Sequence, residues 1–274
     1  MSRIAQRFAA LRAARRAGLA TYLTAGDPDP ATSAMLFAGL AEAGADLIEI
    51  GMPFSDPMAD GPLIQAAGQR ALKAGMSLRG TLALVRDLRR ADNATPIVLM
   101  GYYNPIYRWG AEKFAGDAAA AGVDGLIIVD LPPEEDDELA RPAQAAGLDL
   151  IRLATPTSDE NRLPRIVEGA GGFIYYAAIA GITGTRSPDT AELAVAVARL
   201  RRFTPLPVAV GFGIKTPAQA AAAAQVADAI AVGSALVQRV AQNLGPDGRS
   251  GPGLVPAMLD DVRALAEGVR SARI

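Results

Sequence analysis

The sequence predicts a (β/α)8 barrel, a closed ring of parallel strands surrounded by helices, in one domain that covers residues 1–274. Short apolar runs alternate with alanine-rich stretches of helical periodicity along the chain, which is typical of repeated βα units. Three runs follow an AG-x-D segment, in AGADLIEIG, AGVDGLIIVD and AGLDLIRLA, so a glycine suited to end a helix precedes a strand. The length of 274 residues fits a barrel of roughly 250 residues with additional helices at both termini.

The apolar runs expected to form the strands are Gly18–Thr24, Asp46–Ile50, Pro96–Met100, Gly125–Val129, Leu148–Leu153, Gly172–Tyr176, Pro207–Val210 and Ala229–Val232. The helices between them are expected at Asp29–Ala43, Leu63–Ala74, Leu78–Ala91, Ala111–Ala121, Glu134–Ala146, Asp159–Glu168, Asp189–Arg202 and Pro217–Ala224. An amphipathic N-terminus and the segment after the glycine-rich residues 245–253 add the terminal helices. An open doubly wound sheet is the alternative fold, but AGDPDP stands where its GxGxxG turn would follow the first strand.

The composition excludes several kinds of chemistry. The chain has 27 Lys and Arg against 29 Asp and Glu, so it offers no basic field for nucleic acid or an anionic membrane. It has no Cys and no His, which excludes disulfides, Cys/His metal sites and His-based catalytic triads. Lys73, Lys113 and Lys215 do not directly follow strand-like runs, which disfavours a Schiff base. Acid and base catalysis must therefore come from carboxylates, tyrosine or lysine.

The location of the protein is indicated by features that the sequence lacks. No run approaches the roughly 18 apolar residues of a membrane-spanning helix. The N-terminus has neither the apolar core nor the cleavage site of a secretory signal. Together with the absence of cysteine, these features favour the cytoplasm.

A carboxylate inside the second apolar run is the first candidate for catalysis. Strand alternation places Glu49 on the same face as Leu47 and Gly51, with Ile48 and Ile50 on the other face. A buried carboxylate without partners costs several kcal/mol, so such a residue is either functional or held by hydrogen bonds. The sequence supports both interpretations of Glu49 equally.

A second carboxylate lies in the proline-rich loop MPFSDPMADGPLIQ, which follows this run. Asp60 is within a loop's reach of Glu49, as needed when one acid moves a proton and the other holds a polar group of the substrate. Its position just before Gly61 and Pro62 fits a helix N-cap equally well.

Two glycine-containing turns near the end of the chain predict a phosphate site. VGFGI (residues 210–214) follows the seventh run, and Gly233 and Ser234 follow the eighth at the start of a helix. Such turns in barrels present backbone N–H groups and a helix dipole to an anion. The small and polar segment 180–187 suits a loop that closes over a site. Aromatic residues at strand ends fit either a flat apolar substrate or the core: Tyr22, Tyr102, Tyr103, Tyr175, Tyr176 and Phe212.

Taken together, these motifs resemble the α-subunit family of tryptophan synthase over nearly the whole chain. The matching segments are TYLTAGDP (21–28), IEIGMPFSDPMADGPLIQ (48–65), MGYYNPI (100–106), IIVDLPPEE (127–135), LATPTS (153–158), GFIYY with GITGTR (172–186), VGFGI (210–214) and VGSALV (232–237). The block that begins in the second strand is the most specific of them.

The resemblance implies a lyase that cleaves indole-3-glycerol phosphate into indole and glyceraldehyde 3-phosphate by a retro-aldol reaction. It implies that Glu49 is the acid and base and that Asp60 hydrogen-bonds the indole N–H, with Tyr175 near the glycerol hydroxyls. The substrate pocket is implied at Tyr22, Met100, Tyr102, Ile127, Val129, Leu153, Tyr175, Thr183 and Phe212. The implied phosphate-binding residues are Gly184, Gly213, Gly233 and Ser234.

The resemblance also implies a partner. Asp56, Asn104 and Pro132 are expected to face a β subunit, which receives the indole in the last step of tryptophan biosynthesis. The implied assembly has two α and two β chains, with pyridoxal phosphate (PLP) in the β subunit and neither cofactor nor metal in this chain. Ala178 stands where many relatives have serine, which puts one hydrogen bond of the following loop in doubt.

Three alternatives remain open to different degrees. Other phosphosugar barrels would share the phosphate turns, but they use Lys or Cys in catalysis, and neither stands at a strand end here. A non-catalytic activating subunit of a PLP enzyme is disfavoured because Glu49 and Asp60 are both present. A stand-alone lyase that releases indole would have the same site residues, so the sequence does not distinguish it.

Overall fold

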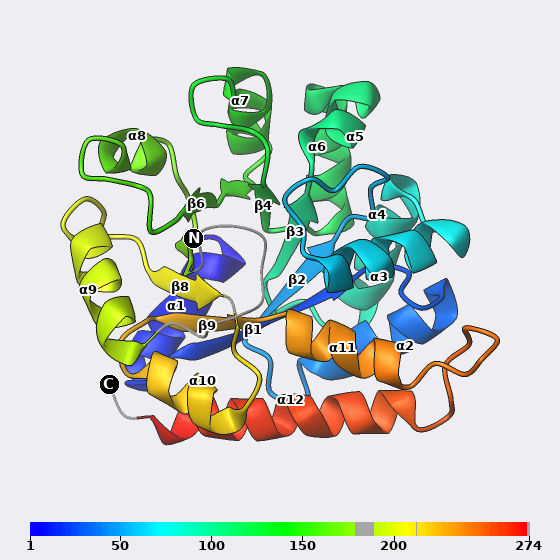
Figure 1. Cartoon of the computed structure of the whole chain (residues 1–274). Coiled ribbons are helices and arrows are strands. Elements are labelled where there is room, and N and C mark those ends of the chain that lie inside the picture. Colours follow the sequence, from blue (N-terminus) through cyan, green and yellow to red (C-terminus); the bar gives the residue numbers. More distant parts are fainter. Residues whose placement is uncertain (179–188, 212, 273–274) are drawn as a thin grey trace.

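The computed structural model describes residues 1–178, 189–211 and 213–272, and it confirms the expected barrel of parallel strands (Figure 1). Neighbouring strands follow the order β5-β4-β3-β2-β1-β9-β8-β7-β6. The ring closes because β5 and β6, which pair with β4 and β7, are consecutive in the chain. The strands are β1 (Gly18–Thr24), β2 (Leu47–Gly51), β3 (Ile97–Gly101), β4 (Gly125–Ile128), β5 (Asp149–Leu150), β6 (Arg152–Ala154), β7 (Ile174–Ala177), β8 (Val208–Gly211) and β9 (Ala229–Val232).

The fifth strand differs from the expectation. The run Leu148–Leu153 was expected to be one strand, but the structure has two short strands with Ile151 between them. The Ile151 N–H donates to the Leu126 carbonyl of β4 at 2.9 Å, and the chain then pairs with β7 instead. The hydrogen bonding passes from one neighbour to the other at this residue, so the strand is interrupted.

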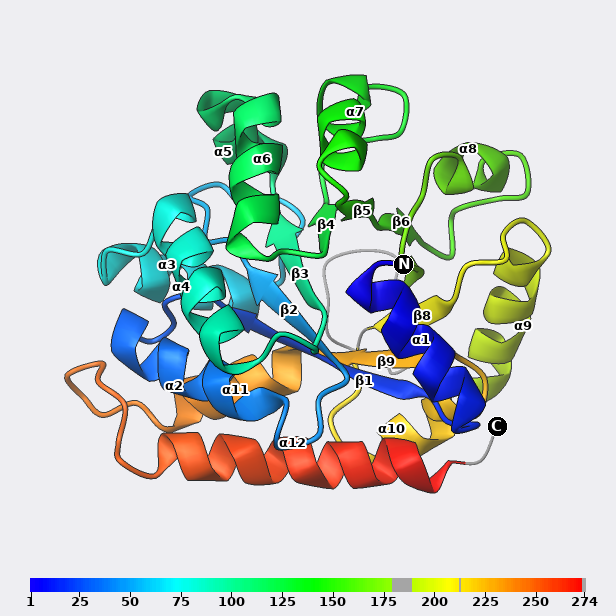
Figure 2. The same cartoon turned by 180° about the vertical axis from the view of Figure 1, so that it is seen from behind.

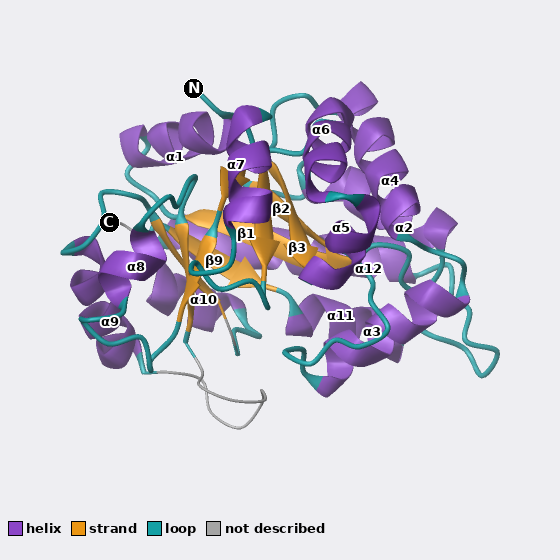
Figure 3. Cartoon of the chain, turned by 90° about the horizontal axis from the view of Figure 1, so that it is seen from above, coloured by secondary structure: helices purple, strands orange, loops and turns teal. Residues whose placement is uncertain are grey.

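Helices surround the strands, as Figure 3 shows. A helix at Tyr103–Trp109 was not expected, because this short segment lacks an alanine-rich repeat and contains Pro105, which a helix tolerates in its first turn. The helices are α1 (Arg3–Ala13), α2 (Pro30–Leu40), α3 (Pro62–Lys73), α4 (Leu78–Ala91), α5 (Tyr103–Trp109), α6 (Ala111–Ala121), α7 (Asp137–Ala145), α8 (Leu163–Val167), α9 (Thr190–Arg201), α10 (Pro217–Ala224), α11 (Ser234–Gln242) and α12 (Leu254–Ser271). The additional helices expected at the two ends of the chain are α1 and α12.

The glycines of the AG-x-D segments end helices as expected. Gly44, Gly122 and Gly147 have φ values of +112°, +94° and +78°, a region of backbone conformation that favours glycine. The aspartate of the same segment has a separate role at the start of the next strand. Asp46 accepts the Leu19 N–H at 3.0 Å, and Asp124 accepts an N–H from the first residue of β3 at 2.8 Å.

Apolar side chains form one core between strands and helices and another inside the barrel. Leu47 belongs to the inner core, whereas Ile48 and Ile50 belong to the outer core, so β2 alternates as predicted. Ile4 and Phe8 of α1 also belong to the inner core. Figure 2 shows α1 lying across one end of the barrel. The N-terminal helix therefore closes this end, the base of the barrel. The site must lie at the opposite end, the mouth, where the strands end.

The described part of the chain contains no helix with an apolar stretch long enough to cross a bilayer.

Candidate active site

Glu49 lies in the middle of β2, on the face that points into the barrel. It is 1% exposed, and neither carboxylate oxygen has a hydrogen-bond partner among the described residues. Burial alone raises the pKa of this carboxyl to about 8. Glu49 is therefore protonated at neutral pH, and the interpretation that hydrogen bonds hold it as a structural carboxylate is not supported in the described structure.

Asp60 lies in the loop between β2 and α3. Helix α3 has Gly61 as its N-cap and no side-chain cap, so the N-cap interpretation of Asp60 is wrong. Burial raises the pKa of Asp60 to about 6, although the Tyr102 hydroxyl acts to lower it. At neutral pH the mouth of the barrel thus holds one protonated and one largely ionised carboxyl group.

Two tyrosines approach Glu49 from the neighbouring parts of the barrel. Tyr22 of β1 is its register partner, and Tyr175 of β7 is 7% exposed. Burial raises the pKa of both phenols, and the nearby Glu49 raises them further. Each hydroxyl is packed against a strand-ending glycine, because a Cβ on Gly51 or Gly211 would lie 2.2 Å or 2.1 Å from it. This pairing was not predicted from the sequence, although a glycine at the end of the next strand follows each tyrosine.

The apolar residues implied for the substrate pocket converge inside the barrel. Ile127 is fully buried in the inner core. Met100, Val129 and Leu153 pack against that core and are partly exposed, as expected for the walls of a site at the mouth. Thr183 and Phe212, which the resemblance also places in the pocket, lie outside the described residues.

The implied phosphate-binding residues come from the ends of two neighbouring strands. Gly213 follows β8 with a φ of +75°, and Gly233 follows β9 as the N-cap of α11. This helix begins at Ser234 and its N-cap glycine supplies no capping side chain, so the start of the helix is suited to an anion. A Cβ on Gly233 would lie 3.1 Å from the Cβ of Tyr22, so the turn borders the pocket wall. Gly184 lies outside the described residues.

The residues expected to face a partner are exposed and lie on one side of the mouth. Asp56, Asn104 and Pro132 follow β2, β3 and β4, which are adjacent in the sheet. The structure therefore brings together three residues that are far apart in the sequence.

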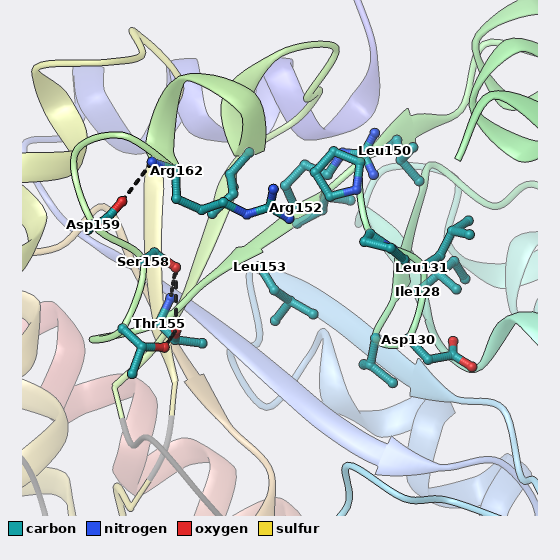
Figure 4. A pocket seen from close by; sticks show the side chains of 16 residues that line it. Ile128, Asp130, Leu131, Leu150, Arg152, Leu153, Thr155, Ser158, Asp159 and Arg162 are labelled. Atoms are coloured by element: carbon teal, nitrogen blue, oxygen red, sulfur yellow. Dashed lines mark hydrogen bonds between the residues drawn. The ribbon is translucent and has the colours of Figure 1, made fainter. Parts of the chain in front are cut away.

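A cavity of about 620 Å³ opens between the segments that follow β4 and β6 (Figure 4). It lies where the fifth strand leaves β4, and it shares Val129 and Leu153 with the implied substrate pocket. Arg152 also lines it and forms a buried ion pair with Asp136. Glu49 and Asp60 do not line this cavity, so it is separate from the two carboxyl groups.

The mouth thus combines a proton donor, a carboxylate, apolar walls and a turn that can receive an anion. Among the described residues there is no group of three or more side chains suited to hold a metal ion. A substrate with a flat apolar part and a phosphate fits this arrangement, with protons moved by the carboxyl groups.

Comparisons with known proteins identify the family. Residues 8–250 match the family model described as tryptophan synthase alpha chain. The crystal structure of tryptophan synthase subunit alpha from Legionella pneumophila is 38% identical, with 99% of both chains covered and a TM-score of 0.90. A tryptophan synthase structure from Mycobacterium tuberculosis is 39% identical, with 98% of both chains covered and a TM-score of 0.88. The chain belongs to the alpha-chain family of tryptophan synthase, whose members are lyases that cleave indole-3-glycerol phosphate.

Proposed function

We propose that Glu49 and Asp60 carry out the cleavage of indole-3-glycerol phosphate in this chain, which acts as a single domain. The main support is the state of Glu49, a fully buried acid with no hydrogen-bond partner in the described structure and a pKa of about 8. An acid in this state can deliver a proton to carbon at neutral pH.

Both carboxyl groups take part in the reaction. Glu49 gives its proton to C3 of the indole ring, which leaves a cationic ring and a carboxylate at Glu49. The negative charge of Asp60 stabilises this cation through the indole N–H. Glu49 then takes the proton of the glycerol hydroxyl next to the ring, the carbon–carbon bond breaks, and its electrons return to the ring. Indole and glyceraldehyde 3-phosphate leave, and Glu49 is protonated again.

The other substrate contacts follow the same proposal. The indole lies against the walls Tyr22, Met100, Tyr102, Ile127, Val129, Leu153 and Phe212, whereas Tyr175 and Thr183 lie near the glycerol chain. The phosphate binds at Gly184, Gly213, Gly233 and Ser234. The uncapped start of α11 and the partial burial of the walls support these assignments.

The test is the rate of indole release. We expect Glu49→Gln to lower kcat by about 100- to 10,000-fold, because an amide of the same shape cannot carry the proton. Asp60→Asn should lose most of the activity, since it lacks the charge. Glu42→Gln, at an exposed glutamate of the same chain, is the control and should leave the rate unchanged. A loss of less than tenfold in Glu49→Gln would contradict the proposal.

The phosphate assignment has its own matched pair of variants. Ser234→Asp places a negative charge in the first turn of α11, where it suits the helix but repels a phosphate dianion. Ser234→Asn has the same shape without the charge. Calorimetry with glycerol phosphate should show much weaker binding to Ser234→Asp than to Ser234→Asn. Equal binding to the two variants would place the phosphate elsewhere.

We further propose that this chain works with a PLP-containing β subunit, in an assembly of two α and two β chains. The exposed residues Asp56, Asn104 and Pro132 form the contact on one side of the mouth. Adding the β subunit should accelerate indole release, and Asp56→Ala should weaken the acceleration without changing the rate of the free chain. If the free chain already has the rate of the mixture, the stand-alone lyase is the better description.

A further inference from the structure

The loop that carries Asp60 is held against the end of β3 by Tyr102, which directly follows that strand. Tyr102 is 3% exposed, and its hydroxyl accepts the Ala59 N–H at 3.0 Å. Its ring packs on Phe54, with the two ring centroids 5.4 Å apart. Tyr102 therefore contacts the loop near its beginning and again next to the catalytic carboxyl group.

Asp60 directly follows Ala59. Burial raises the pKa of Tyr102, and the Asp60 carboxyl group, which interacts electrostatically with the same hydroxyl, raises it further. A phenol oxygen that accepts from an amide N–H keeps its own proton to donate, and an ionised carboxylate can only accept. Ala59 thus fixes the direction in which the Tyr102 hydroxyl donates. Donation from this hydroxyl to Asp60 favours the ionised form of the carboxyl group, in the opposite direction to burial, which favours the neutral form.

The backbone beside Tyr102 is fixed from the other side. The Tyr103 N–H donates to Asp130 Oδ1 at 2.8 Å, and Asp130 belongs to the segment after β4. The Tyr103 hydroxyl donates to Glu138 at 2.7 Å and not to Asp60. The two adjacent tyrosines are therefore a natural pair for comparison, because both phenols interact with a carboxyl group but only that of Tyr102 interacts with Asp60.

We infer that Tyr102 is a positioning residue for the cleavage reaction. Its hydroxyl accepts the Ala59 N–H and donates to the Asp60 carboxylate, so that this carboxylate stays ionised and is directed at the indole N–H. The inference rests on the proposed role of Asp60. It goes beyond a place in the pocket wall, because it assigns the effect to the hydroxyl group and not to the apolar ring.

The test compares Tyr102→Phe with Tyr103→Phe in the full chain. Tyr102→Phe keeps the ring and its contact with Phe54 but removes the hydroxyl that we infer to donate to Asp60. We expect the acidic limb of the kcat/KM profile to move upward by about one pH unit. The rate would then fall about fivefold at pH 6 and change little at pH 8. Tyr103→Phe should keep the limb of the original protein.

A second readout does not depend on activity. In protein labelled with ¹³C at the aspartate carboxyl carbons, the resonance missing from Asp60→Asn identifies Asp60. Its titration midpoint should rise in Tyr102→Phe and stay in place in Tyr103→Phe. Tyr102→Leu, which also lacks the hydroxyl, serves the same purpose if the phenylalanine variant does not fold.

The outcomes separate this inference from the proposed function. An unchanged titration of Asp60 in Tyr102→Phe would overturn the inference, and so would an equal loss of rate at every pH without movement of the limb. Absence of indole release from the original protein would overturn the proposed function, while the titration would still report whether Tyr102 acts on Asp60.

Discussion

Both ends of the barrel bury carboxyl groups, but the two ends treat them differently. At the base, Asp46 is 3% exposed and forms two hydrogen bonds with Arg16, both at 2.8 Å. Asp124 is 5% exposed and lies 2.5 Å from Arg89. At the mouth, Glu49 is 1% exposed and has no such cation among the described residues. Burial is similar in all three cases, so the difference lies in the partners.

The difference separates the carboxylates that stabilise the fold from the carboxyl groups that we propose to act in catalysis. A buried carboxylate with arginines and backbone N–H groups has its charge balanced and joins neighbouring strands. A buried carboxyl group without partners remains protonated, and its proton is available to a substrate. Asp60 is intermediate, because burial raises its pKa to about 6 while one phenol opposes the shift.

The largest expected effect is on the stability contributed by Glu49. Its pKa is 4.5 in the unfolded chain and about 8 in the folded protein, so folding binds a proton between these values. Stability from this group is present below pH 4.5 and is lost as the pH rises through 8. At about 1.4 kcal/mol per pH unit, the loss reaches about 5 kcal/mol.

Glu49→Gln removes this dependence, because an amide does not titrate in this range. We expect the free energy of unfolding of the original protein, relative to the variant, to fall steadily between pH 5 and pH 8 (an interval of about three units at about 1.4 kcal/mol each). Urea unfolding followed by circular dichroism at several pH values measures the difference. A constant difference would show that Glu49 has a hydrogen-bond partner or an ordinary pKa.

At the base, replacing a carboxyl group by an amide should reduce stability and leave kcat unchanged. Asp124→Asn leaves Arg89, whose side chain is 9% exposed, without its counter-charge. We expect a loss of roughly 3 kcal/mol in the free energy of unfolding, because breaking a buried pair strands one charge. The kcat of the folded fraction should not change, since Asp124 is at the far end of the barrel from Glu49. A large loss of kcat with unchanged stability would contradict the division between the two ends.

The sequence predicted the barrel because its repeated units leave a local signal. The glycines at 44, 122 and 147 recur in three of the units and have a local structural cause, a positive φ where a helix ends. The aspartates at 46 and 124 accept an N–H from the preceding strand. The interruption at Ile151 was not predictable, since it depends on which neighbouring strand the backbone pairs with. Helix α5 was missed because a short helix has too few residues for a periodic pattern.

For the site, the sequence located the two carboxyl groups but could not determine their state. Whether Glu49 is paired depends on side chains from other strands, which strand alternation does not reveal. The contact of Tyr102 with Ala59 joins residues 43 positions apart. Such contacts depend on how the loops fold over the ends of the strands.

The smallest expected effect is at Arg7, the second arginine of Asp46. Arg7 approaches Asp46 at 3.6 Å with 27% of its side chain exposed, whereas Arg16 makes two hydrogen bonds at 2.8 Å. Because a partly exposed single contact contributes little, Arg7→Ala should cost less than about 1 kcal/mol. Arg16→Ala should cost more, since it removes two charge-assisted bonds from a buried carboxylate. Urea unfolding of the two variants under the same conditions measures the ranking. If Arg7→Ala lowered the free energy of unfolding as much as Arg16→Ala, the arginines would stabilise Asp46 through the total positive charge at the base. Hydrogen-bond geometry would then not explain the contrast with the mouth.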